Sequence, residues 1–216
     1  MSTAEQLVDK LRKAIGYAIA TKKPWKFKQS VELIVAFRGI NPKLPEFRFR
    51  DPVTLPKGLG KEVKVCVVAD GDMAHRAKEA GAYKVITKDE LNRIDKKTAK
   101  KIAQECDWVL VKADLMGLAG RVLGPALGPR GKAPIPVPPN ADIASYIQRF
   151  KNTTRLFTKD QPFVACKIGT EDMTIDDLVE NAVTVLNYIE NKIRRPLTQI
   201  GKIYVKTTSG PSIEVL

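Results

Sequence analysis

The feature that most constrains the fold is a change in hydrophobic pattern that divides the chain into three stretches. In the first stretch, large apolar side chains at 31, 33, 35 and 37 alternate with Glu32, Ile34 and Ala36, which is the period of a strand with one buried face. Beyond Val63 the pattern becomes continuous, and residues 65–69 are uninterruptedly apolar, as expected for a strand covered on both faces. Alternation returns at residues 202–206. The chain is therefore expected to contain two kinds of sheet.

The middle stretch, residues 66–156, alternates strands with helices. Strands are expected at 65–69, 83–86 and 108–111, and helices at 71–81, 88–105, 115–123 and 142–150. The segment 124–139 is rich in proline and glycine and is expected to be a loop. Strands that alternate with helices predict a parallel α/β unit with right-handed crossovers.

The two outer stretches are each too short in elements to form a good core. The first has a helix after Thr3 and strands at 31–37 and 47–50, and the last has strands at 163–168, 202–206 and 212–216 with a long helix from Thr174. Together they make two helices over about five strands, a plausible α+β sandwich. We therefore expect a discontinuous domain, residues 1–65 plus 157–216, with the α/β unit of residues 66–156 inserted into it. The two chain crossings would form a hinge.

Charge points to a polyanionic partner. The chain has 37 Lys and Arg against 24 Asp and Glu, a net charge of +13, and a lone folded protein does not benefit from such self-repulsion. Residues 1–65 carry a net +8 and residues 66–156 a net +6, whereas residues 157–216 carry −1. Nucleic acid is the first candidate partner and an anionic membrane surface the second.

Cysteine usage and hydropathy indicate a cytoplasmic protein. Cys66, Cys106 and Cys166 are far apart in apolar surroundings, so we expect buried thiols in a reducing compartment rather than a disulfide. Charged residues interrupt the apolar stretch 7–20, which argues against a secretory signal. No stretch approaches the ~18 apolar residues of a membrane-spanning helix.

Several kinds of enzyme chemistry lack the residues they need. His75 is the single histidine, and its proximity to Asp72 is better explained by an exposed helical ring near a first-turn acid than by an acid–base pair. Without clustered cysteines a zinc site is not expected. The glycine loops at 58–61 and 128–132 lack the spacing and the Ser or Thr of a phosphate-binding P-loop. We expect no enzyme and no cofactor; a nucleotide-binding α/β enzyme is the alternative.

Two segments carry chemistry suited to RNA. Lysines at 22, 23, 26 and 28 surround Trp25 and Phe27, so phosphate-binding charges alternate with rings that can stack on bases. The segment 206–211 places three hydroxyl side chains before Gly210, which suits close approach to RNA 2′-OH groups. The alternatives are a solvated basic face with core aromatics for the first segment and a plain hairpin turn for the second.

Three motifs in register extend this interpretation. Residues 53–61 (VTLPKGLGK), 127–134 (LGPRGKAP) and 207–211 (TTSGP) resemble the ribosomal protein L1 family, the universal stalk protein of the large ribosomal subunit, and the order, spacing and length match over essentially the whole chain. The proline-rich run after Lys132 resembles the archaeal type. The resemblance implies an α+β domain built from both termini and an inserted Rossmann-like α/β domain. It also implies a protein that is monomeric when free and whose first domain binds the stalk region of large-subunit ribosomal RNA.

The resemblance implies further partners and a set of RNA-contacting residues. The partners are transfer RNA, whose release from the exit site such proteins assist, and the protein's own messenger RNA, whose translation they often repress; a free regulatory protein with messenger RNA as its main target is a variant of this hypothesis. Carried over by position, the contacting residues are Lys26, Phe27, Glu32, Lys167, Gly169, Thr207, Thr208, Ser209 and Gly210. The family commonly has Met at the position of Ser209, which puts the apolar RNA contact of that Met in doubt here. Residues 128–134 would either contact RNA secondarily or shape the hinge.

Overall fold

The chain folds into two units in the computed structural model, which describes residues 3–39, 41, 44–158, 161–196, 199 and 201–216. Unit 1 combines residues 1–61 with 152–216, and unit 2 consists of residues 62–151. Both boundaries lie four or five residues before those predicted from the pattern. The second differs because residues 153–157 form a strand of the sheet of unit 1 that the pattern did not predict. The predicted fold class, α/β together with α+β, is confirmed.

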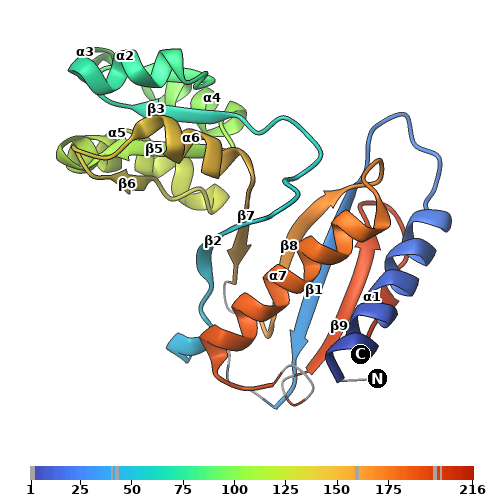
Figure 1. Cartoon of the computed structure of the whole chain (residues 1–216). Coiled ribbons are helices and arrows are strands. Elements are labelled where there is room, and N and C mark those ends of the chain that lie inside the picture. The colour runs from blue at the N-terminus through green and yellow to red at the C-terminus, as the bar shows by residue number, and fades with distance from the viewer. Residues whose placement is uncertain (1–2, 40, 42–43, 159–160, 197–198, 200) are drawn as a thin grey trace. The chain divides into compact units, whose positions relative to one another are not determined.

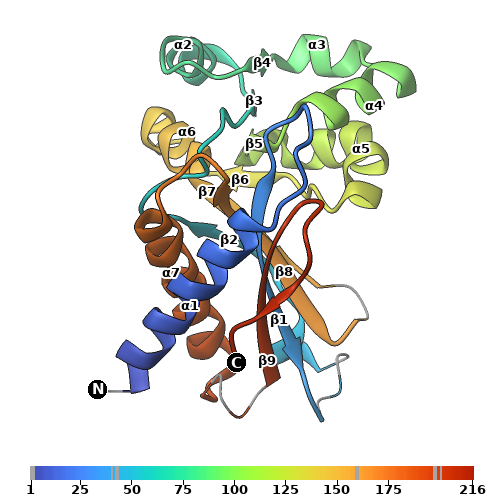
Figure 2. The ribbon, with the colours of Figure 1, turned by 90° about the vertical axis from the view of Figure 1, so that its right-hand side faces the viewer.

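Unit 1 contains an antiparallel sheet with two long helices on one face (Figures 1 and 2). Among its described residues, six strands lie in the order β10-β9-β1-β8-β7-β2. Their bounds are β1 Ser30–Phe37, β2 Arg50–Thr54, β7 Thr153–Phe157, β8 Phe163–Thr170, β9 Gly201–Thr207 and β10 Ile213–Glu214. The helices are α1 Thr3–Ala20 and α7 Ile175–Ile193, and a short 3-10 helix, η1, spans Pro45–Phe47.

The core of unit 1 follows directly from the alternation in the sequence. Val31, Leu33 and Val35 of β1 are buried, whereas the residues between them are partly exposed. Leu11 and Ile15 of α1 are fully buried between the helix and the sheet, and each such side chain contributes about 1.5–3 kcal/mol. The predicted strand at 47–50 is wrong at its start, because Phe47 lies in η1 and the strand begins at Arg50.

Unit 2 is a parallel sheet with helices on its faces (Figure 1). Its strands are β3 Val65–Val68, β4 Lys84–Ile86, β5 Trp108–Lys112 and β6 Ile135–Val137, in the order β4-β3-β5-β6. Its helices are α2 Gly71–Glu79, α3 Lys88–Arg93, α4 Lys96–Glu105, α5 Met116–Leu127 and α6 Ile143–Lys151, with 3-10 turns η2 Ala113–Leu115 and η3 Gly128–Arg130. Every residue of β3 is buried, as the continuous apolar run predicts.

Two element predictions for unit 2 need correction. The helix expected over 88–105 is two helices, because Asp95 accepts a hydrogen bond from the backbone N–H of Thr98 and so begins a second helix. The loop expected over 124–139 is partly regular: α5 continues through Pro125, and Pro136 lies in β6. β6 is one of the two edge strands of this sheet, where a residue without an N–H is tolerated.

The expectation that all three cysteines are free thiols is wrong. Cys66 of β3 and Cys106, directly after α4, form a disulfide with their Cα atoms 5.8 Å apart. Both residues are fully buried in the core of unit 2. The third cysteine, Cys166, is free and buried, and burial raises the pKa of its thiol to about 12.

Candidate nucleic-acid interface

The residues carried over as RNA contacts come together at one end of three neighbouring strands. Because β1 runs antiparallel to both neighbours, its first residues adjoin the last residues of β8 and β9. Val31 lies opposite Gly169 on one side and opposite Thr207 on the other. Lys26 and Phe27 immediately precede β1, so all the candidate segments meet at this end of the sheet.

The segment 207–210 forms a tight turn tied to the start of β1. The backbone N–H of Gly210 donates to the carbonyl of Thr207 over 3.2 Å, and that of Thr208 donates to the carbonyl of Ser30 over 3.0 Å. The Thr208 hydroxyl accepts from the Ser30 backbone N–H over 3.0 Å. A Cβ at Gly210 would lie 2.3 Å from the Thr207 hydroxyl oxygen, so this turn has room only for glycine unless Thr207 moves.

Gln29 joins this turn to the lysine-rich segment, a role that the sequence analysis missed. The side chain is 1% exposed, its Nε2 donates to the Lys23 carbonyl over 2.8 Å, and its Oε1 accepts from the Ser209 backbone N–H over 3.0 Å. One amide therefore fixes the spacing between segments 22–28 and 207–210. From the sequence alone, a glutamine between two polar segments is expected to be a surface residue. The sequence therefore does not predict the hydrogen bonds by which Gln29 joins the two segments.

An ion pair fixes the other side of the same segment. Glu171 accepts from the Gln29 backbone N–H over 3.0 Å and lies 2.6 Å from the Lys22 ammonium. The hydrogen bond from Lys22, followed by that from the Gln29 backbone, holds the pKa of Glu171 below its ordinary value. Lys28 pairs with Asp172 at 2.5 Å. Two of the lysines thus serve to anchor the segment.

The remaining residues of the segment point to solvent. Phe27 is 48% exposed and Trp25 is 55% exposed, and their rings are stacked with centroids 6.3 Å apart. Lys26 lies between them and is exposed. Exposed aromatic rings are unfavourable in water, and two stacked rings provide a surface on which the planar groups of a partner can stack. The alternative of core aromatics does not describe these two rings.

Glu32, Lys167 and Lys206 lie side by side across β9-β1-β8. Glu32 is opposite Lys167 of β8 and Lys206 of β9. The Lys206 ammonium donates to the Thr208 carbonyl over 3.0 Å and lies 3.9 Å from the Glu32 carboxylate. Lys206 was absent from the carried-over set, and the structure adds it.

Thr207 and Gly169 are buried, in contrast to Thr208, which is exposed. A Cβ at Gly169 would lie 2.4 Å from Leu178 of α7 and 2.6 Å from the Met173 sulfur, so this glycine permits close packing at the end of β8. In this arrangement Thr207 and Gly169 shape the surface, and Lys26, Phe27, Glu32, Thr208 and Ser209 lie at it.

The other two motifs, residues 53–61 and 127–134, make hydrogen bonds to other parts of the protein. Asn181 of α7 is fully buried, donates to the carbonyls of Gly58 and Ile168, and accepts from the Lys57 backbone N–H. In unit 2, the Lys132 ammonium donates to the carbonyls of Ala103 and Cys106 at 3.0 and 2.7 Å, which caps the C-terminal end of α4. Lys132 therefore stabilises unit 2, and the segment 128–134 offers less charge to RNA than its sequence suggests.

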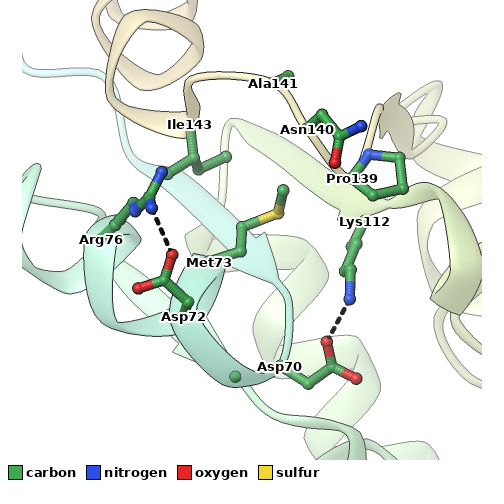
Figure 3. A pocket seen from close by; sticks show the side chains of 10 residues that line it. Asp70, Asp72, Met73, Arg76, Lys112, Pro139, Asn140, Ala141 and Ile143 are labelled. Carbon is green, nitrogen blue, oxygen red and sulfur yellow. Dashed lines mark hydrogen bonds and ion pairs between the residues drawn. The ribbon is translucent and has the colours of Figure 1, made fainter.

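A hollow of about 740 Å³ lies beyond the carboxyl ends of β3, β5 and β6, the edge at which parallel sheets bind ligands (Figure 3). Its charged side chains pair within it: Lys112 with Asp70 at 2.7 Å, and Arg76 with Asp72 at 2.6 Å. The lining charges cancel, so the hollow does not present the excess positive charge that a nucleotide phosphate requires. This geometry does not favour the nucleotide-binding alternative.

The described residues contain neither a metal-site cluster nor a candidate membrane span. Within them, no group of three or more His, Cys, Asp or Glu side chains is placed to hold a metal ion. No helix in this part of the chain has the length and apolar character needed to cross a bilayer.

Comparison with known proteins identifies similar chains over nearly the full length. The sequence model of the ribosomal protein L1p/L10e family matches residues 17–211. The chain is 55% identical over 208 residues to the large ribosomal subunit protein uL1 of Staphylothermus marinus, covering 96% of this chain and 97% of that one. It is 50% identical over 213 residues to the protein of the same name from Aeropyrum pernix, with coverages of 98% and 97%. For Sulfolobus acidocaldarius the identity is 45% over 217 residues, with coverages of 100% and 97%.

Proposed function

The chain belongs to the ribosomal protein L1p/L10e family, and from this membership we propose that it is a structural, non-enzymatic component of an archaeal large ribosomal subunit. In this role it binds the stalk region of large-subunit ribosomal RNA through unit 1. The observation that carries the proposal is the convergence of segments 22–28, 167–169 and 207–210 on one end of the sheet.

Recognition would be rigid, because the contacting groups are held before RNA arrives. Gln29, Glu171 and Lys206 fix the backbone of both loops through hydrogen bonds and ion pairs. A preformed surface loses little conformational entropy on binding. Phe27 would stack, Lys26 would hold a phosphate, and Glu32 would accept from a 2′-OH or a guanine edge.

A salt series with a stalk fragment of large-subunit RNA tests this proposal. We expect Lys26→Ala to weaken binding and to reduce the slope of log K against log salt by about one, since one phosphate contact is lost. Lys78→Ala is the matched control, because Lys78 is an exposed lysine on α2 of unit 2. An unchanged slope for Lys26→Ala would remove that residue from the phosphate contacts, and a wild-type protein that ignores the fragment would end the proposal.

We propose two finer roles as well. The protein would assist release of deacylated transfer RNA from the exit site, and it would repress translation of its own messenger RNA by binding a structure similar to the stalk. Competition between the stalk fragment and the 5′ region of its messenger tests the second role, since both RNAs must displace each other from one site. Cosedimentation with large subunits separates a ribosomal protein from a free regulator of messenger RNA.

A further inference from the structure

The sheet of unit 1 has a second face that neither long helix covers. α1 and α7 both pack on the same side, as the two views show (Figures 1 and 2). The burial patterns agree: in β1 and β9 buried residues alternate with partly exposed ones, and the buried set faces the helices. An antiparallel sheet face that borders only water is expected to be polar.

The centre of this uncovered face is apolar instead. Ile34 of β1 lies opposite Tyr204 of β9 on one side and Ala165 of β8 on the other, and all three are partly exposed. Phe157 of β7 continues the row, since it lies opposite Ala165. Within the described part of the chain, no hydrogen bond of the Tyr204 hydroxyl is found. Partly exposed apolar side chains that gather on an uncovered sheet face favour a surface with a partner.

Positive charge flanks the apolar row along β9. Lys206 precedes the row toward the candidate interface, and Lys202 follows it on the other side, two residues from Tyr204 in each case. Lys202 forms an ion pair with Glu214, and Lys206 lies 3.9 Å from Glu32. Arg155 of β7 adds a positive charge on the outward side, whereas the ammonium nitrogen of Lys167 is buried. A ring between cations suits a stacked base with phosphates on either side.

The uncovered face is also continuous with the candidate interface. Glu32 and Lys167 belong to both, because they lie opposite each other on the outward side of β1 and β8, each two residues from the pair Ile34 and Ala165. Two residues along a strand are about 7 Å, roughly the spacing of neighbouring nucleotides. The candidate interface and the uncovered face therefore lie within reach of neighbouring nucleotides of one RNA.

We propose that the outward face around Ile34, Ala165 and Tyr204 is a second RNA contact, which takes one or two unpaired nucleotides of the RNA bound at the candidate interface. Tyr204 stacks on a base, Ile34 and Ala165 contact its edge or the ribose, and Lys202 exchanges its ion pair with Glu214 for a flanking phosphate. The inference rests on the proposed function and extends its footprint to Ile34, Ala165 and Tyr204, which are not among the contacts implied by the family resemblance.

The test measures affinity for the same stalk RNA fragment. Tyr204→Ala should raise Kd about 5- to 100-fold, the range for loss of one base–aromatic stack, whereas Tyr204→Phe should stay within about twofold. Tyr83→Ala is the matched control, since Tyr83 is 44% exposed in unit 2. Lys202→Ala should reduce the salt slope by about one if the lysine contacts a phosphate.

The possible outcomes separate this inference from the proposed function. Weak binding by Tyr204→Ala, with normal binding by Tyr204→Phe and Tyr83→Ala, supports it. If Tyr204→Ala binds normally while Lys26→Ala does not, the sheet face is not an RNA contact and the proposed function stands. If Tyr204→Ala binds the fragment normally yet fails to cosediment with large subunits, the face contacts a protein and the inference is wrong. If the wild type ignores the fragment, both proposals fail.

Discussion

Replacing Gln29 should loosen the candidate interface without removing any group that faces RNA. In Gln29→Leu the shape is nearly kept, but the bonds to the Lys23 carbonyl and the Ser209 N–H are lost. Each such bond contributes about 0.5–1.5 kcal/mol, so the two together contribute about 1–3 kcal/mol. The lower end is favoured because Lys23 is exposed and its carbonyl can bind water instead.

The loss should appear as movement of the two loops and then as weaker binding. Apparent affinity falls with the fraction of molecules whose loops are correctly placed, so we expect Kd for the stalk fragment to rise by up to about 10-fold. Hydrogen exchange gives a readout independent of RNA, because the Ser209 amide loses its acceptor in Gln29→Leu. Gln29→Glu separates the two bonds, since a carboxylate still accepts from Ser209 but has no N–H for Lys23.

The reasoning is refuted if Gln29→Leu shows unchanged Kd and unchanged exchange at Ser209 at a temperature where unit 1 is folded. If the Ser209 amide loses its protection from exchange but Kd does not change, Gln29 has only a structural role. Preorganisation of the two loops would then make no contribution to RNA binding. Near-native circular dichroism and a melting scan establish that the comparison is made on folded protein.

Three further perturbations have defined outcomes. Thr208→Val should weaken RNA binding by about 1–3 kcal/mol through an unsatisfied RNA partner, and it also strips the Ser30 N–H of its acceptor, so a melting scan must accompany the titration. Replacing both Cys66 and Cys106 by Ala should destabilise unit 2 by about 4 kcal/mol in the chain-entropy account, given their separation of 40 residues, with Cys166→Ala as the calorimetric control. Lys132→Met should lower the stability of unit 2 by about 1–2 kcal/mol and leave the RNA salt slope unchanged, because its ammonium caps α4.

The elements of the fold with a regular local pattern of apolar residues could be predicted from the sequence. β1 and β9 alternate with a period of two, and β3 is continuously apolar, so both kinds of sheet and the discontinuous fold class follow from pattern alone. β7 was missed because its sequence, TTRLF, is half polar; its threonines are buried by pairing with β2. Burial of that kind depends on a partner strand about 100 residues away.

Contacts between side chains that are distant in the sequence could not be predicted from the sequence. The Cys66–Cys106 disulfide joins a strand to a helix end with no motif at either site. Lys132 lies in a glycine-rich motif that is expected to contact RNA or to shape the hinge, and only the fold brings its ammonium to the end of α4. The positions of the candidate RNA contacts came from family resemblance, and the structure adds how they are held together.

The insertion of unit 2 does not interrupt the candidate interface because the strands that lead into and out of it pair with each other. Thr54 at the end of β2 lies opposite Thr153 at the start of β7, and the Leu55 N–H donates to the Asn152 carbonyl over 2.8 Å. The insertion therefore begins and ends at β2 and β7, at one edge of the sheet, whereas the interface lies on β9, β1 and β8. Its tethers join Gln29 to Glu171 and Ser209, which are 142 and 180 positions away, so it forms only when the two chain ends fold together. Stability of the inserted unit and competence of the interface should therefore be separable, and a disulfide-free variant that loses RNA affinity while unit 1 stays folded would contradict that separation.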